Sequence, residues 1–485
     1  MDSIFEQING FLSSIFFYDI FFGQVDGATM PFIVAWLIAG GVILTFRFGF
    51  INVRMFVHSY KIITGKYKTA DDVGEITPFQ SLTTALSATV GLGNIAGVAI
   101  AISIGGPGAT FWMILAGFFG MTLKFTEVTL AQIYREVRPD GRIMGGAMQY
   151  LSKGFATRGH ARLGAVLAVL FSIFAIGGSL GAGNAFQTSQ AVGVISERIP
   201  FFATYPIVFG LILATIVGFV IIGGIKRIAQ TAEKIVPMMV LIYLMASLWI
   251  LFVNASDVPG AISLIFHEAF APTAAVGGFI GVLVQGFKRA AFSSEAGVGS
   301  AAIVHSTAAV KYPVRQGMVA LYEPFIDTIV ICSMTALVIV TTGVYDPSGE
   351  YASLVASREG AALTAAAYGT VISWFPAILS FSIILFAFST MISWSYYGER
   401  SWTYLFGEKY TLLYKLIFIS FTVIASVSSA AVMLNFSDLL FFAMALPNLI
   451  GLYVLQGDVK ANLDAYMLKW KDGELDREAI RKKKH

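Results

Sequence analysis

Cysteine and charge are both scarce in this sequence. Cys332 is the only cysteine among 485 residues, which excludes a disulfide scaffold. Charged residues make up 13%, about half of their usual share in a soluble domain, and a net charge of +3 argues against nucleic acid as a partner. Hydrophobic residues instead make up 56%, and the mean hydropathy is +0.75. Because only hydrocarbon solvates such a surface, the sequence predicts an all-α polytopic protein with the lipid bilayer as its partner.

Apolar stretches of about 20 residues predict membrane-spanning helices. Eleven such stretches lie at 30–47, 79–104, 108–134, 161–196, 204–224, 228–253, 275–303, 313–342, 370–397, 410–430 and 436–456. Residues 1–29, which contain several Phe and one Tyr, predict an extracytoplasmic segment that lies at the membrane interface.

The distribution of Lys and Arg predicts the orientation. With the N-terminus outside, the inner segments carry 26 of the 32 basic residues, whereas the outer segments carry only Arg198 and Arg358. Because cytoplasmic loops collect basic residues, this asymmetry predicts eleven spans with the N-terminus out and the C-terminus in. Residues 457–485 then form a basic cytoplasmic tail near anionic lipid.

Two of the spans are interrupted by a Gly-x-Gly motif beside small or polar residues, TVGLGNIA at 89–96 and EAGVGSAA at 295–302. Four spans separate the motifs, so the repeat unit has five spans. Because five is an odd number, the second copy must cross the membrane in the opposite direction to the first. We therefore predict a first repeat over 79–253, an inverted repeat over 275–456, and an extra helix at 30–47. Close helix packing is the alternative explanation for each glycine pair.

A helix that unwinds at mid-membrane leaves main-chain groups without partners, which is tolerated only beside a polar cavity. Free amides bind anionic groups, and free carbonyls suit a hard cation such as Na⁺. A small zwitterion beside a monovalent cation would bind to both the free amides and the free carbonyls. The chain has no Walker A sequence for ATP hydrolysis and no nucleophile–base constellation, so an ion-driven transporter is predicted rather than an enzyme.

Five stretches resemble the alanine/glycine:cation symporter family, also called the sodium:alanine symporter family. They are ATVGLGNIAG (88–97), GGPGATFWM (105–113), GNAFQ (183–187), KRAAFSSEAG (288–297) and FSTMISWSYYGER (388–400). The resemblance implies the leucine-transporter fold, a 5+5 inverted repeat, here with one additional N-terminal helix. The chain departs from the family pattern at Leu92, Ile114, Ala147, Gln149, Phe441 and Phe442, which leaves the exact substrate open.

The resemblance also implies site residues. The substrate carboxylate is expected at the amides of Gly91, Leu92 and Gly93. The other expected substrate contacts are Gln187, Phe292, Thr390 and Trp394. A Na⁺ ion is expected between the carbonyls of Ser87 and Val90 and the hydroxyls of Ser389 and Thr390, and Asn94 fits either a second cation position or a direct substrate contact.

Several of these residues have simpler interpretations. Ser389 and Thr390 can bond back to their own helix, Trp394 can belong to an interfacial aromatic belt, and Gln187 can join two helices.

Acidic residues near the breaks have two interpretations each. Glu127 either pairs with Lys124 or holds freed amides of a broken helix, and Glu323 and Asp327 serve either proton coupling or structure. Glu295, Gly297 and Gly299 are expected to shape the second break or a gate.

The sequence therefore predicts a symporter in a prokaryotic plasma membrane. It would couple an inward cation gradient, Na⁺ first and H⁺ second, to uptake of small neutral amino acids by alternating access. Alanine or glycine is the first expected substrate and glutamine another. The alternative is an ion channel or a substrate sensor with a transporter-like fold. A monomer suffices for this function, and the oligomeric state is left open.

Overall fold

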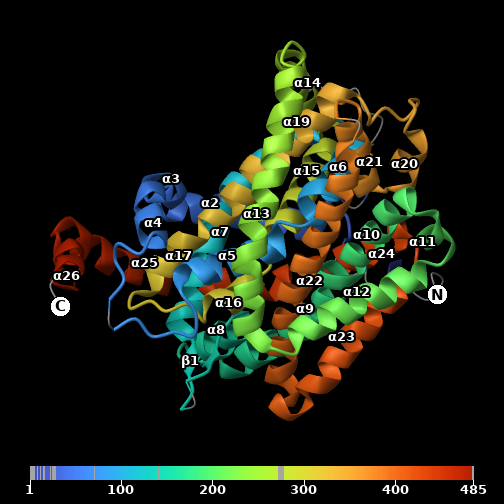
Figure 1. The fold of residues 1–485 in the computed structure, drawn as a ribbon. Helices are drawn as coiled ribbons and strands as arrows, with labels where there is room; N and C mark the ends of the chain where they lie inside the picture. Colours follow the sequence, from blue (N-terminus) through green and yellow to red (C-terminus); the bar gives the residue numbers. More distant parts are fainter. Residues whose placement is uncertain are drawn as a thin grey trace.

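The computed structural model describes residues 6–482 except 8, 11, 12, 15, 16, 22, 24–28, 70, 140, 271–277 and 373. Most of the described chain is helical (Figure 1). The first half contains α2 Phe32–Arg47, α3 Ile51–Arg54, α4 Phe56–Ile63, α5 Pro78–Thr89, α6 Leu92–Gly105, α7 Ala109–Tyr134, β1 Glu136–Val137, β2 Ile143–Met144, α8 Ala147–Ala156, α9 Ala161–Leu180, η1 Gly181–Ala185, α10 Phe186–Arg198, α11 Pro200–Thr204, α12 Pro206–Ile221 and α13 Gly224–Val253.

The second half is helical as well. It contains α14 Val258–Phe270, α15 Gly278–Ser294, α16 Ala301–His305, α17 Pro313–Ala320, α18 Tyr322–Pro324, η2 Phe325–Cys332, α19 Ser333–Thr342, α20 Ala352–Ser357, α21 Gly360–Gly369, α22 Phe375–Phe406, η3 Glu408–Tyr410, α23 Thr411–Ala425, α24 Ala430–Ala443, α25 Ala445–Lys471 and α26 Glu474–Lys482.

Within the described residues, seven helical segments are long and apolar enough to cross a membrane. They are Pro78–Gly105, Ala109–Tyr134, Ala161–Arg198, Gly224–Val253, Pro313–Thr342, Ile378–Phe406 and Ala430–Lys471, and each overlaps a predicted span. The other four predicted spans contain shorter helices: α2 and α12 have 16 residues, α15 has 17 and α23 has 15. The count of eleven therefore stays a prediction.

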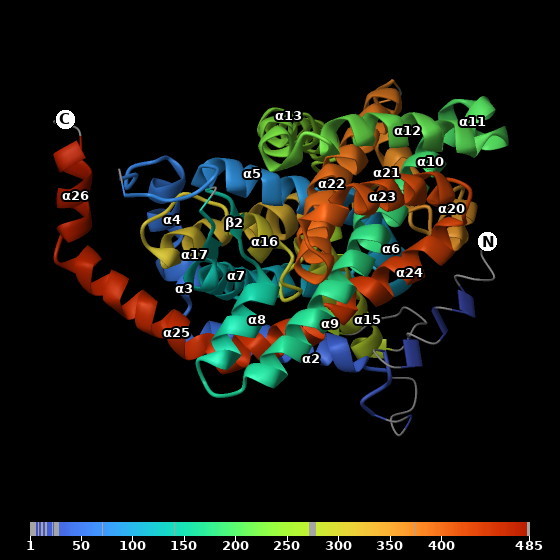
Figure 2. The same cartoon turned by 90° about the horizontal axis from the view of Figure 1, so that it is seen from below.

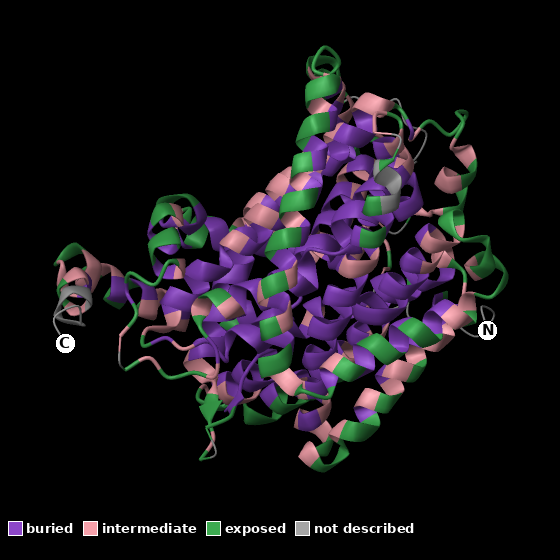
Figure 3. Cartoon of the chain, in the orientation of Figure 1, coloured by how far each residue is buried: buried purple, intermediate pink, exposed green. Residues whose placement is uncertain are grey.

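The outer surface of the molecule is apolar. Large hydrophobic side chains on α9, α12, α13 and α23 are exposed, among them Val166, Phe219, Trp249, Phe252 and Leu416 (Figure 3). An apolar exterior of this extent has its natural solvent in lipid. Together with the seven long helices, it makes the chain a multi-pass membrane protein.

The two glycine-interrupted segments lie at the centre of the bundle. The most apolar window of Pro78–Gly105 is entirely buried, so the residues around the first interruption are enclosed by other helices. α6 packs against α15 and α21, while α5 packs against α13, α16 and α22 (Figures 1 and 2). Residues 292–302 around the second interruption are buried as well, so both interruptions lie inside protein rather than against lipid.

Described residues near each terminus contact the rest of the protein. The Asp19 carboxylate accepts a hydrogen bond from the amide of Met30 at 2.9 Å, close to the start of α2. The remainder of the predicted interfacial segment 1–29 lies partly outside the described residues. At the other end, α25 continues well past residue 456, and α26 turns back so that Asp476 pairs with Lys66 at 2.8 Å (Figure 2). The predicted tail is thus largely helical.

Candidate functional site

The first interruption is only two residues long. α5 ends at Thr89, Val90 is non-helical, Gly91 is extended, and α6 begins at Leu92. In an unbroken helix the Gly91 amide would donate to the carbonyl of Ser87. It donates instead to Asn94 Oδ1 at 2.9 Å, and the Asn94 amide donates to the Gly91 carbonyl at 3.2 Å rather than to that of Val90. The carbonyls of Ser87 and Val90 therefore lose their usual helical donors.

Three predicted contact residues surround this break. A Cβ atom built on Gly91 would lie 2.2 Å from Thr390 Oγ1 and 3.5 Å from Gln187 Oε1, and one built on Gly93 would lie 3.6 Å from Phe292 Cδ1. The Leu92 amide donates to Gln187 Oε1 at 3.4 Å. Residues that are nearly 300 positions apart in the sequence thus meet at one stretch of bare main chain.

The hydroxyl groups on α22 differ in their partners. Ser87 Oγ donates to the Ser389 carbonyl at 2.8 Å, which joins α22 to the first break. Ser389 Oγ donates back to the Phe386 carbonyl at 2.9 Å, so the back-bonding alternative describes Ser389. Thr390 Oγ1 is buried and has no hydrogen-bond partner within the described part of the chain. Because a donating hydroxyl keeps its lone pairs, both oxygens still suit a hard cation.

A π-helical turn, η1, precedes Gln187. Gln187 Nε2 donates to the Ala182 carbonyl at 3.0 Å within this turn, while its Oε1 accepts from Leu92. Gly183 in the same turn lets α22 approach, because a Cβ there would lie 2.3 Å from Trp394 Cβ. π-turns inside helices are frequent at functional sites. Gln187 therefore joins two helices and also faces the break.

Trp394 is not part of an interfacial belt. Its side chain is buried, and its Nε1–H donates to Glu295 Oε1 at 2.7 Å. Ser300 Oγ donates to the other oxygen of Glu295. Trp394 on α22 is thereby tied to the second interruption, between α15 and α16.

The second interruption requires glycine for conformational reasons. Gly297 and Gly299 have φ values of +88° and +84°, in the left-handed region that side chains disfavour. The Gly299 amide donates to Glu127 Oε1 at 3.2 Å. Asn448 Nδ2 donates to the same carboxylate oxygen at 2.7 Å and to the Gly297 carbonyl at 2.9 Å. Groups freed by the break are thus held by α7 and α25.

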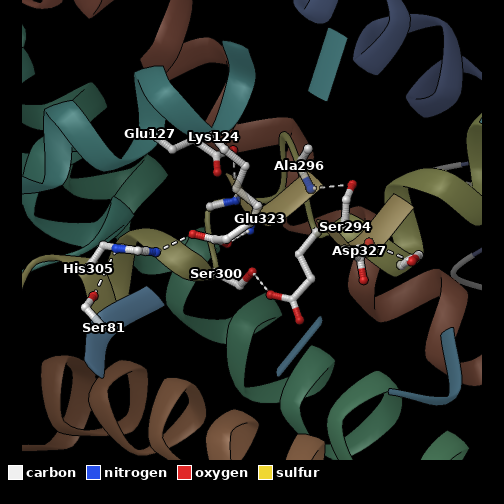
Figure 4. A network of polar contacts seen from close by, with 12 residues as sticks. Ser81, Lys124, Glu127, Ser294, Ala296, Ser300, His305, Glu323 and Asp327 are labelled. Carbon is white, nitrogen blue, oxygen red and sulfur yellow. Dashed lines mark hydrogen bonds and ion pairs between the residues drawn. The ribbon is translucent and has the colours of Figure 1, made fainter. Parts of the chain in front are cut away.

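Charged side chains extend this buried network toward α5 (Figure 4). Lys124 pairs with Glu323 at 3.1 Å, not with Glu127, and Glu323 also contacts His305. His305 Nδ1 lies 2.9 Å from Ser81 Oγ on α5. His305, which lies just after the second interruption, therefore links that segment to the helix before the first one.

Both ends of the Asn94 side-chain amide are held by protein groups. Its Nδ2 donates to the carbonyl and the carboxylate of Asp327 in the π-helical segment η2, and its Oδ1 accepts from Gly91. Asp327 also accepts from Ser293 Oγ at 2.8 Å and Thr328 Oγ1 at 2.7 Å. These contacts favour neither of the two roles left open for Asn94, and they place a buried carboxylate next to the first break.

Sequence reasoning missed Asn448 and the residue behind it, Tyr150, whose hydroxyl donates to Asn448 Oδ1. Asn448 is a lone polar residue in an apolar stretch, so no local pattern marked it.

The family model described as the sodium:alanine symporter family matches residues 17–480. The chain belongs to this family. Among its relatives, the sodium/alanine symporter AgcS of Methanococcus maripaludis is 38% identical over 437 residues, covering 90% of this chain and 94% of AgcS. The probable sodium/glutamine symporter GlnT of Bacillus subtilis is 34% identical and covers 91% and 89% of the two chains.

A solved structure shows the same fold. The crystal structure of MhsT in complex with L-phenylalanine matches with a TM-score of 0.54 at 15% identity, covering 79% of this family member and 89% of MhsT. MhsT has the leucine-transporter fold that the sequence resemblance implied. At this identity the likeness concerns the fold alone.

Proposed function

We propose that this sodium:alanine symporter family member takes up small neutral amino acids, alanine or glycine first, together with Na⁺. The observation that carries the proposal is the first break, where the carbonyls of Ser87 and Val90 lose their helical donors beside the unpartnered hydroxyl of Thr390. Three such oxygens fit a hard monovalent cation. The names of AgcS and GlnT support sodium as the coupling ion and leave both alanine and glutamine as candidates.

The substrate carboxylate binds beside this cation at the start of α6. The amides of Gly91, Leu92 and Gly93 open that helix, and the helix dipole favours negative charge there. In this structure, the Gly91 amide donates to Asn94 and the Leu92 amide donates to Gln187. Substrate binding exchanges these two internal hydrogen bonds for hydrogen bonds to the carboxylate. Gln187 Oε1, which gives up the Leu92 amide in this exchange, then becomes free to accept a hydrogen bond from the substrate.

Transport proceeds by alternating access of two inverted five-helix repeats around this central site. The repeats are 79–253 and 275–456, within eleven spans whose N-terminus is outside a prokaryotic plasma membrane. The link from Lys124 through Glu323 and His305 to Ser81 joins the two interrupted segments, so it fixes their relative position in this conformation.

The inward movement of one Na⁺ ion provides enough free energy to accumulate a neutral amino acid. Crossing about 100 mV yields roughly 2.3 kcal/mol, and a tenfold gradient adds about 1.4 kcal/mol. Their sum supports accumulation of a neutral solute by a factor of a few hundred, since about 1.4 kcal/mol corresponds to each factor of ten.

Reconstitution tests this function. The purified chain in proteoliposomes is expected to accumulate radiolabelled alanine when Na⁺ is outside and choline inside, and to show less uptake with choline on both sides. Glycine and glutamine in parallel vesicles rank the substrates, and a proton gradient without Na⁺ tests H⁺ as the ion. Equal alanine uptake with and without either gradient would overturn coupled symport. Na⁺ flux without saturable amino-acid uptake would favour the channel alternative.

A further inference from the structure

An aromatic cluster closes one side of the first break. It consists of Phe186 on α10, Phe292 on α15, Trp394 on α22 and Phe441 on α24, which we call the aromatic wall. Phe292 stands nearest the break, 3.6 Å from a Cβ built on Gly93. Its ring centre is 5.1 Å from that of Phe186 and 5.0 Å from that of Phe441.

Phe441 completes this wall from behind. Its side chain is buried, and its ring lies 6.0 Å from the ring of Trp394 as well as against Phe292. Phe441 thus contacts both aromatic residues that the sequence analysis assigned to the substrate. None of the hydrogen bonds at the main chain of the break involves it.

A hydrogen bond and two ion pairs fix the residues of the aromatic wall. Trp394 is fixed by its hydrogen bond to Glu295 at 2.7 Å. The Arg289 guanidinium lies 5.1 Å from the ring centre of Phe292 and pairs with Asp438, which is three residues before Phe441 on α24. Lys288 pairs with the same carboxylate at 2.8 Å. One ion-paired cluster therefore positions both Phe292 and Phe441.

We propose that Phe441 sets the upper size limit for the substrate side chain, by backing the wall against which that side chain packs. The inference rests on the proposed function and deepens it: the substrate class is restricted to amino acids with very small side chains. A packed interior does not yield to an added methylene without shifting its neighbours. A single methylene in an apolar pocket discriminates between substrates by about 10–200-fold.

The test measures selectivity rather than activity alone. Proteoliposomes with an inward Na⁺ gradient take up radiolabelled alanine, and unlabelled glycine, alanine, valine and leucine compete. For Phe441→Ala we expect the inhibition constants of valine and leucine, relative to alanine, to fall about tenfold or more, because the removed ring leaves space. Phe441→Trp is expected to shift the same ratio toward glycine. Phe441→Leu provides a milder change in case Phe441→Ala does not fold.

The matched control is Phe442→Ala. Phe442 has the same side chain, the same helix and complete burial. Its ring packs on Phe17 at 5.8 Å and edge-on against Phe441 at 5.2 Å, but the described ring contacts do not join it to Phe292 or Trp394. We expect its selectivity ratios to equal those of the wild type. Unchanged selectivity ratios in Phe441→Ala and Phe441→Leu would overturn the inference, and so would an equal shift in Phe442→Ala. In either case, Na⁺-driven uptake by the wild type would still uphold the proposed function. Wild-type vesicles that accumulate no amino acid under a Na⁺ or proton gradient would overturn both.

Discussion

Gly91 lies where two helices approach the unwound main chain most closely. A methyl group there would lie 2.2 Å from Thr390 Oγ1, a distance that real Cβ contacts do not reach. Accommodating it would push α22 away and displace an oxygen that the proposed cation site needs. We therefore predict that Gly91→Ala lowers Na⁺-driven alanine uptake at least tenfold in proteoliposomes.

Gly97, one and a half turns further along α6, is the control for this substitution. A Cβ built there has its nearest atom, the Leu92 carbonyl oxygen, at 4.0 Å. Gly97→Ala is expected to keep uptake and to favour the helix slightly. Equal uptake by both alanine variants would show that the close approach at Gly91 has no role in transport.

Thr390 provides a test of the cation ligands. Valine has nearly the same shape as threonine but lacks the oxygen that is unpartnered in the described structure. We predict that Thr390→Val raises the Na⁺ concentration for half-maximal alanine uptake by about tenfold, which corresponds to roughly 1.4 kcal/mol. Thr390→Ser restores an oxygen and should recover part of this loss. The same Na⁺ dependence in all three proteins would remove Thr390 from the cation site.

At the residue scale, the sequence predicted which side chains surround the first break but not how they are held. Gln187, Phe292 and Thr390 occur within recognisable motifs, so their positions could be anticipated. The contact between Asn448 and Tyr150 could not, because it joins segments 298 residues apart. The buried setting of Trp394 also depends on long-range packing, which a local pattern does not encode.

At the scale of helical elements, the two interruptions differ in kind. The first is extended and depends on close approach, whereas the second depends on left-handed backbone at Gly297 and Gly299. A Cβ at Gly299 would also lie 2.8 Å from Asn448 Oδ1, the acceptor for Tyr150.

We predict that Gly299→Ala destabilises the folded protein. Left-handed backbone costs a side chain about 1–2 kcal/mol, and overpacking adds about 1–3 kcal/mol. Gly343→Ala is the control, because Gly343 has φ +71° but no described atom within 4 Å of the added methyl group. Thermal unfolding in detergent should show the larger loss for Gly299→Ala. Equal losses would mean that the contact with Asn448 does not contribute.

Long helices were easier to predict than their irregularities. Continuous apolar stretches marked α7 and α13 within a few residues. The π-helical segments η1 and η2 went unrecognised because one inserted residue leaves the hydrophobic pattern almost unchanged. α14 was missed because its 13 residues are too few to span a bilayer.

At the scale of the whole molecule, the predicted orientation is directly testable. Cys332 is buried, so single cysteines can be introduced without replacing it. Ser348, which is exposed in the loop before α20, should lie outside, and Lys471 at the end of α25 should lie inside. We predict that a membrane-impermeant maleimide labels Ser348→Cys in intact cells and Lys471→Cys only after permeabilisation. The reverse pattern would contradict the assigned orientation.

The central claim is that one unwound segment holds an amino-acid carboxylate beside a cation. Binding at adjacent sites must be reciprocal, because each ligand changes the affinity of the other by the same factor. The most direct measurement is equilibrium binding of radiolabelled alanine to the purified protein at a series of Na⁺ concentrations, with choline keeping ionic strength constant. We predict that Na⁺ lowers the Kd for alanine at least tenfold and that Thr390→Val abolishes most of this effect. A Kd for alanine that does not depend on Na⁺, or on H⁺ in its place, would contradict the account.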